Sequence, residues 1–368
     1  MTEPIPLWSG RHVSLGDREV FVRYAAVDRA AGADAEPALY VHGLGGSAAN
    51  WTDLMALLSG HPAAAVPGDG AASAAAAAAD PVLLDGAAVD LPGFGFSPPP
   101  PDGDYSISGY ARTVARLIER RGRGRVHLFG NSLGGAVCTR VAARRPDLVR
   151  TLTLISPALP DLRPRYATFR FPVLLVPRLG DRLMSRLRSH PAQARVAATV
   201  DLIYFDPKRI HPLRLTEEIA EVDRRDGLDY PGAVTLGAAR AIVKEYFRVG
   251  RASLWNDAAL VEAPVLAIFG SHDRLVDRRL THRAARQFRT GRSVVLMRTG
   301  HAAMMETPAA VEREVRSFLR DHAGTNSAEG AGAAEPAAGG GQAVPGDGEA
   351  AAGGHDRISG NAPPVPPG

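Results

Sequence analysis

The stretch RVHLFGNSLGG, residues 125–135, places a serine between two glycines where one side-chain pattern gives way to another. Residues 125–129 alternate and include valine and phenylalanine, which predicts a short strand. The following LGGAVCTRVAARR, residues 133–145, is rich in small and helix-forming residues and ends in arginines, which predicts a helix. A strand that turns into a helix within two residues forces the corner residue, Ser132, into a strained conformation, usually with a positive φ.

Glycines stand two residues before and two residues after this corner, at Gly130 and Gly134. Side chains at those positions would collide, so glycine is needed at both, and the pattern is G-x-S-x-G. The corner would lift the Ser132 hydroxyl clear of the sheet and aim the next N–H groups at whatever binds it, as in a nucleophile elbow. A glycine-rich turn with an ordinary N-cap serine is the alternative. Partner residues in the right order would decide between the two.

The composition bounds the class of protein. The chain has 368 residues, of which 45% are hydrophobic and 22% are charged, as in a globular protein. A net charge of +4 without a nucleic-acid motif predicts no nucleic-acid partner. Cys138 is the one cysteine, which excludes an internal disulfide. The N-terminal stretch lacks the features of a secretory signal, and no run approaches about 18 apolar residues, so we expect a cytoplasmic protein.

Strand-like and helix-like segments alternate along the chain, which predicts an α/β fold with a mostly parallel, eight-stranded sheet flanked by helices. The first two strands read as a hairpin, and most of the others are short apolar runs, as expected for parallel strands covered on both faces. The predicted strands are 11–16, 19–25, 37–43, 86–93, 125–130, 150–156, 264–270 and 293–300, and the predicted helices are 50–58, 108–121, 133–145 and 308–321.

The alternation stops between about residues 157 and 262, where helix-like pieces occur without a convincing core strand. We interpret 157–262 as a helical cap inserted between two parts of one sheet domain, 1–156 and 263–322. Residues 60–81 and 323–368 consist largely of alanine, glycine and proline. They predict a low-complexity surface insertion and a disordered tail, because such segments bury too little apolar surface to offset the entropy of ordering.

Three polar residues follow three different predicted strands, in the order Ser132, Asp273 and His301. In an open parallel sheet the loops after the strands lie at one edge, where active sites form. We therefore expect these three side chains to meet. The turn His42-Gly43-Leu44 also follows a strand, and a glycine-rich turn there exposes N–H groups that can donate to an oxyanion.

With these motifs in this order, the chain resembles the α/β-hydrolase-fold superfamily over about residues 37–321. It is most similar to capped serine hydrolases of the esterase- and lipase-like or meta-cleavage-product-hydrolase-like type. The resemblance implies that Ser132 is the nucleophile, that His301 is the general base and acid, and that Asp273 orients His301. A serine at this corner argues against haloalkane dehalogenases and epoxide hydrolases, which use an aspartate nucleophile.

The resemblance also implies an oxyanion hole made by the N–H groups of Leu44 and Leu133. One departure from the family is Asp277, which stands where a proline often follows the acid by four residues. Asp161 follows an earlier strand, where some members carry the acid, and is the alternative to Asp273.

Five other residues near the motifs have simpler interpretations. His42 is expected to hold the oxyanion turn by hydrogen bonds, and Asn131 is expected to fix the elbow. His272 is expected to be exposed and without a role. Met304 and Met305 are expected to pack beside His301, with lining of the pocket as the alternative.

The resemblance implies hydrolysis of a carboxylic ester of a small molecule through an acyl-enzyme. Two alternatives stay open: hydrolysis of a carbon–carbon bond in a dienoic keto acid, and a non-catalytic ligand-binding member of the fold. No metal motif or phosphate loop occurs, so neither a metal nor another cofactor is expected.

The stretch 162–195 has eight arginines against one acidic residue, Asp181, and the apolar run FPVLLVP. Such a cap favours an ester with a moderate or long acyl chain, or weak contact with an anionic membrane. A solvated, arginine-rich cap face is the alternative. The sequence leaves the substrate-binding residues and the oligomeric state open.

Overall fold

Eight strands form a single sheet in the computed structural model, which describes residues 5–26, 35–61, 82–161, 176 and 178–323. The strands are β1 (Gly10–Ser14), β2 (Glu19–Tyr24), β3 (Glu36–Val41), β4 (Leu84–Val89), β5 (Val126–Asn131), β6 (Val149–Ile155), β7 (Val265–Gly270) and β8 (Gly291–Leu296). Their order across the sheet is β1-β2-β4-β3-β5-β6-β7-β8. β2 is antiparallel to β1 and β4, and all other neighbours are parallel. The predicted mostly parallel, eight-stranded sheet is confirmed.

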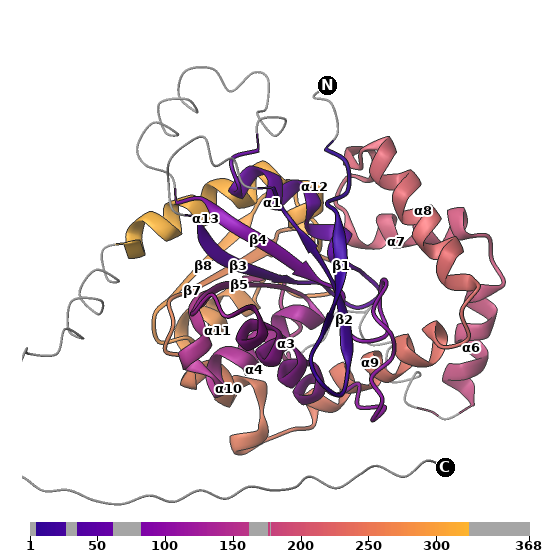
Figure 1. Cartoon of the computed structure of the whole chain (residues 1–368), viewed down its shortest axis with the longest axis horizontal. Coiled ribbons are helices and arrows are strands. Elements are labelled where there is room, and N and C mark those ends of the chain that lie inside the picture. The colour runs from indigo at the N-terminus through magenta and orange to yellow at the C-terminus, as the bar shows by residue number, and fades with distance from the viewer. Residues whose placement is uncertain (1–4, 27–34, 62–81, 162–175, 177, 324–368) are drawn as a thin grey trace, which may run out of the picture. The chain divides into compact units, whose positions relative to one another are not determined.

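Helices cover both faces of this sheet (Figure 1). One face shares a core with α3 (Ile107–Arg121), α4 (Leu133–Arg144), α10 (Leu254–Leu260) and α11 (Leu280–Gln287). The other face shares a core with α1 (Thr52–Leu58), α12 (Ala303–Glu306) and α13 (Pro308–Ala323). In β3, for example, Leu39 and Val41 lie in the first core, whereas Ala38 and Tyr40 lie in the second. Since alternate side chains point to opposite faces, double coverage explains why the strands are continuous apolar runs.

Helix α13 illustrates how the sequence pattern fixes the packing. Val311, Val315, Phe318 and Leu319 recur at helical spacing and are at most 4% exposed, so they form one buried stripe. Burying each side chain of this size contributes about 1.5–3 kcal/mol. The proline at position 308 starts the helix without loss, because the first turn has unpaired N–H groups in any case.

Helices also fill the described part of the stretch between β6 and β7. They are α6 (Leu179–Arg188), α7 (Ala192–Ile203), α8 (Pro212–Asp226), α9 (Pro231–Tyr246) and α10. All of them belong to the same compact unit as the sheet. α9 and α10 are tied to α4 by buried ion pairs, since Arg140 contacts Glu245 at 3.0 Å and Asp257 at 2.8 Å. The domain limits at 157 and 262 stay a prediction.

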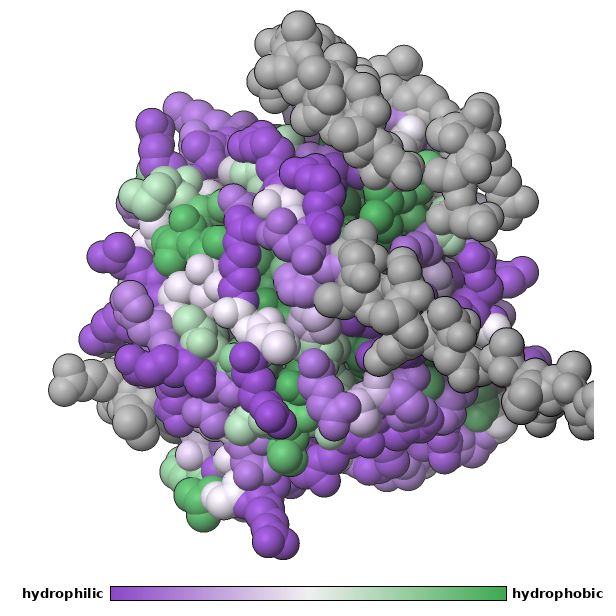
Figure 2. All heavy atoms as spheres, turned by 90° about the vertical axis from the view of Figure 1, so that its left-hand side faces the viewer, coloured by the Kyte–Doolittle hydropathy of each residue, from purple (hydrophilic) through white to green (hydrophobic). Residues whose placement is uncertain are grey.

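Two predicted segments, 60–81 and 323–368, fall outside the described residues except for positions 60, 61 and 323. Within the described ranges, no helix has the length and apolar character needed to cross a membrane. The face on the side of α11 and α13 carries mostly hydrophilic side chains with hydrophobic ones scattered between them (Figure 2). Such scattering is normal for a protein surface.

Candidate active site

The corner between β5 and α4 has the backbone that its sequence predicts. Ser132 has φ 51° and ψ −115°, a positive-φ conformation that is rare outside glycine. A Cβ on Gly130 would lie 2.6 Å from the carbonyl oxygen of Gly134, and a Cβ on Gly134 would lie 2.2 Å from that of Val41. Neither distance is possible for a real side chain, so both positions require glycine. The corner therefore brings α4 directly against the end of β3.

Hydrogen bonds fix this corner to its neighbours. The Ser132 N–H donates to the carbonyl of Ile155, at the end of the adjacent strand β6, over 3.1 Å. The Asn131 side-chain amide donates to the same carbonyl at 3.0 Å and to the carbonyl of His301 at 3.3 Å. Asn131 thus holds the elbow, as predicted, and also connects it to the loop that carries His301.

His301 and Asp273 form a buried pair. Nδ1 of His301 lies 2.8 Å from Oδ2 of Asp273, and the two residues are 5% and 1% exposed. The other carboxylate oxygen, Oδ1, accepts the backbone N–H groups of Leu275 and Val276 at 2.8 and 2.9 Å. Burial alone would raise the pKa of Asp273, but the charge and hydrogen bond of His301 and the Val276 N–H outweigh it and hold that pKa below its usual value. Asp273 is therefore an ionised acceptor for His301.

The turn after β3 lies against the elbow. A Cβ on Gly43 would lie 3.2 Å from the Cβ of Ser132, so the absence of a side chain allows this approach. Among the described residues, the N–H groups of Leu44 and Leu133 have no hydrogen-bond partner. Unpaired backbone donors such as these are what an oxyanion hole requires.

His42 holds this turn from behind. Its Nε2 accepts the N–H of Leu91 at 2.9 Å, so the ring proton is on Nδ1 and is donated to the carbonyl of Gly43 at 2.7 Å. Burial lowers the pKa of His42 to about 4, which keeps the ring neutral near pH 7. The structural role predicted for His42 is confirmed.

Comparison with known proteins identifies the family. Residues 37–308 match the family described as alpha/beta hydrolase fold. The chain belongs to the α/β-hydrolase family. The esterase Rv0045c of Mycobacterium tuberculosis is 30% identical over 236 residues, which cover 63% of this chain and 73% of that protein.

Two solved structures show the same fold. One is the naproxen esterase of Bacillus subtilis, with a TM-score of 0.61 and 20% identity over 85% of this chain and 92% of that one. The other is the 2-hydroxy-6-oxo-6-phenylhexa-2,4-dienoate hydrolase of Rhodococcus, with a TM-score of 0.63 and 18% identity over 85% and 98%. At these identities the structures support the fold alone. The sequence relatives support ester hydrolysis as the general activity of this α/β hydrolase.

A residue that the sequence analysis missed, Glu306, braces the histidine loop of this hydrolase. Its buried carboxylate accepts the N–H of Gly300 at 2.7 Å and the N–H groups of Phe205 and Asp206 at 3.0 Å each. The N–H of His301 donates to the carbonyl of Ile203 at 2.6 Å. The end of α7 and the loop after it are therefore joined to the histidine loop in two ways: through Glu306 at Gly300, and directly at the N–H of His301.

The sequence did contain a signal for Glu306. A lone glutamate within the apolar stretch AAMMETPAAV cannot be buried without partners, so it should find hydrogen-bond donors. Which donors it finds depends on the approach of a segment about 100 residues away, which no local pattern specifies.

The structure also places the other residues that the sequence singled out. Asp277 pairs with Arg279 at 2.6 Å, and neither Asp277 nor Asp161 contacts His301 among the described residues. His272 is exposed, as predicted. Met304 lies in the core and Met305 packs against it; Met305 also lines a cavity that contains no triad residue among the described residues, so lining of the substrate pocket stays a prediction.

Proposed function

We propose that this chain is a serine hydrolase that cleaves the carboxylic ester of a small molecule through Ser132, His301 and Asp273. The buried contact of 2.8 Å between His301 and Asp273 carries the proposal. It supports an Nδ1–H of His301 that is donated to Asp273, which leaves Nε2 to act as the base. The positive φ of Ser132 at the elbow supports the assignment of the nucleophile.

The reaction proceeds in two halves. His301 Nε2 takes the proton of the Ser132 hydroxyl as Oγ attacks the ester carbonyl carbon, and the carbonyl π electrons move onto oxygen. When that oxyanion collapses, the alkoxide leaves with the proton from His301, and an acyl-Ser132 ester remains. A water molecule, deprotonated by the same nitrogen, then releases the acid and restores the serine.

The unpaired N–H groups of Leu44 and Leu133 would stabilise the oxyanion in both halves. Leu133 is the first residue of α4, so the positive end of the helix dipole adds to this stabilisation. Among the described residues, no hydrogen bond joins Ser132 to His301. Such bonds are often long until substrate is bound.

We further propose an acyl chain of moderate or long length and weak contact with anionic lipid. Most of the predicted basic stretch, 162–195, lies outside the described residues. Within its described part, Leu179, Leu183 and Leu187 recur every four residues along α6 and are 39–47% exposed. Exposed arginines share this helix, and an amphipathic basic helix of this kind suits an anionic lipid surface.

The test is a series of p-nitrophenyl esters from acetate to decanoate, run beside a dienoic keto acid. We expect kcat/KM to rise with chain length and all ester hydrolysis to be lost in folded Ser132→Ala. Cleavage of the keto acid alone would replace the ester assignment with carbon–carbon bond hydrolysis. Turnover of neither substrate class would favour a ligand-binding protein.

A further inference from the structure

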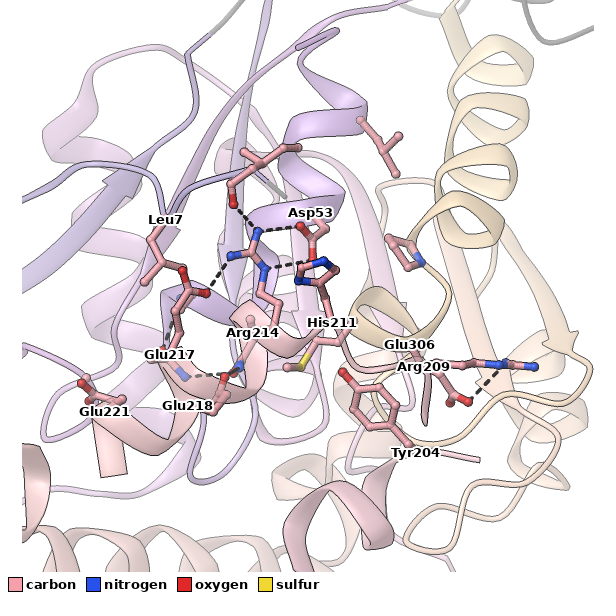
Figure 3. A pocket seen from close by; sticks show the side chains of 18 of the residues that line it. Leu7, Asp53, Tyr204, Arg209, His211, Arg214, Glu217, Glu218, Glu221 and Glu306 are labelled. Atoms are coloured by element: carbon pink, nitrogen blue, oxygen red, sulfur yellow. Dashed lines mark hydrogen bonds and ion pairs between the residues drawn. The ribbon is translucent and has the colours of Figure 1, made fainter. Parts of the chain in front are cut away.

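A cavity of about 260 Å³ lies beside helix α8 (Figure 3). Its walls come from five parts of the chain that are distant in sequence: the N-terminal segment at Leu7, the region of α1 at Asp53, the turn at Phe96, the segment from Tyr204 through α8, and the region of Met305 after the histidine loop. No residue of the triad is among the described residues that line it. The cavity therefore has its own set of recognition groups.

Carboxylates outnumber cations in this cavity. Arg214 is held by Asp53 and by Glu217, each at 2.7 Å, and Arg209 is held by Glu306 at 3.2 Å. Both arginines are thus already neutralised from within the lining. The acidic lining residues are Asp53, Glu217, Glu218, Glu221 and Glu306, and the basic ones are Arg209, His211 and Arg214.

Glu218 is the carboxylate for which these ion pairs provide no cation. Its Oε1 accepts one hydrogen bond, from the side-chain amide of Asn50 at 2.9 Å, and no cation pairs with it among the described residues. Glu221, one turn away, is instead engaged by Arg224 at 2.7 Å. One carboxylate oxygen of Glu218 is therefore free to accept a further donor.

Tyr204 supplies a second, independent sign of a ligand. The residue is 2% exposed, and its hydroxyl points into the cavity without a hydrogen bond to any described residue (Figure 3). Burial, with the nearby carboxylates of Glu218 and Glu306, raises the pKa of Tyr204, so the group stays a neutral phenol. Because this hydroxyl faces the cavity and no described residue occupies it, it can exchange a hydrogen bond with a ligand there.

We propose that this cavity binds a small primary amine. The ammonium group would donate one N–H to the free oxygen of Glu218 and another to the hydroxyl oxygen of Tyr204. An ammonium has three donors and no acceptor, which matches a lining of free acceptors. Leu7 and Met305 offer apolar wall for the carbon chain, and the volume, just below the range of about 300–1,000 Å³ that is usual for ligand pockets, suits a small ligand.

The proposal predicts a characteristic pH dependence. Burial, reinforced by the charges of Glu221 and Glu217, raises the pKa of Glu218 to about 7. Amine affinity should therefore increase from pH 6 to pH 8 as Glu218 ionises, and decrease above pH about 10 as the amine loses its proton. The other charged and titratable groups around the cavity are Asp53, Glu306, Arg209, Arg214, His211 and Tyr204.

The test is calorimetric titration of the full chain with n-hexylamine at pH 8, beside the neutral isostere 1-hexanol. We expect saturable binding of the amine, at least about tenfold tighter than that of the alcohol. Glu218→Gln should weaken amine binding by about ten- to a hundredfold, the usual range for one charged hydrogen bond. The isosteric Tyr204→Phe should weaken it by about two- to tenfold.

Asp223→Asn is the matched control, because Asp223 is an exposed carboxylate on the same helix and does not line the cavity. It should leave amine binding unchanged. Thermal melting establishes that each variant is folded, and Tyr204→Phe keeps the test decisive if Glu218→Gln does not fold. No saturable binding at millimolar amine, equal binding of the alcohol, or binding unaffected by both cavity variants would overturn the proposal. Since the readout is binding, it is independent of whether Ser132 supports hydrolysis.

Discussion

Replacing Asp273 with asparagine replaces one carboxylate oxygen with an NH₂ group and leaves the side-chain volume almost unchanged. The asparagine oxygen must face the N–H groups of Leu275 and Val276, which now lie 2.8 and 2.9 Å from Oδ1 of Asp273, because an NH₂ group there would oppose two donors. The NH₂ group then faces Nδ1 of His301 and can only donate to it. His301 would carry its proton on Nε2 and could not accept the proton of Ser132.

This tautomer change sets the size of the effect. In a triad of this kind the aspartate-to-asparagine change lowers kcat by about 10⁴, which corresponds to about 5 kcal/mol in the activation free energy. KM should change little, because Asp273 is 1% exposed and cannot reach the substrate. Because the pKa of Asp273 is lower in the folded state, its ionised carboxylate also stabilises the fold. This stabilisation is fully present above the unfolded-state pKa near 4 and is lost as the pH falls through the lower folded-state pKa. The Asp273→Asn variant should lack this part of the acid sensitivity.

The assay is hydrolysis of p-nitrophenyl butyrate at pH 8, with urea unfolding to establish that the variant is folded. Asp161→Asn is the matched control, since Nδ1 of His301 bonds to Asp273 and not to Asp161. If Asp273→Asn keeps kcat within tenfold of the wild type, or Asp161→Asn is the variant that collapses, the reasoning is wrong.

Three further substitutions test separate parts of the account. Gly134→Ala should destabilise the fold by several kcal/mol in urea unfolding, because its Cβ would lie 2.2 Å from the carbonyl oxygen of Val41; wild-type stability would contradict the close approach. Glu306→Gln should lower kcat by about tenfold with KM nearly unchanged and shift the pH profile of kcat/KM. Each carboxylate oxygen accepts two donors, so the glutamine NH₂ group would oppose either the N–H groups of Gly300 and Phe205 or those of Asp206 and Arg209, and would disturb the bracing of the histidine loop; an effect on melting temperature alone would mean a merely structural role. Leu183→Asp should reduce co-sedimentation with phosphatidylglycerol vesicles and leave hydrolysis of a soluble ester unchanged; unaltered sedimentation would remove α6 from the lipid contact.

The elbow could be predicted from sequence because its determinants are local. The positive φ of Ser132 and the need for glycine on both sides follow from a strand and a helix that meet within two residues. The pairing of Asp273 with His301 could also be predicted, since both residues follow parallel strands whose ends share one edge of the sheet.

The contacts that the sequence did not predict join segments that are far apart in the chain. α10 falls inside the stretch interpreted as cap, yet its buried Asp257 pairs with Arg140 on α4, 117 positions earlier. The bonds of Glu306 and the unpaired hydroxyl of Tyr204 arise only when the segments around α7 and α8 reach the sheet domain. Residue type and spacing do not encode such contacts, which are set by how separate elements pack.

The central claim is that Ser132 is the nucleophile activated by His301. The most direct measurement is intact-protein and peptide mass spectrometry after reaction with a fluorophosphonate. We expect a single adduct on the peptide that contains Ser132, complete loss of this adduct in Ser132→Ala, and strongly slowed labelling in His301→Ala. An adduct on another residue, or continued ester turnover by the folded Ser132→Ala protein, would contradict it.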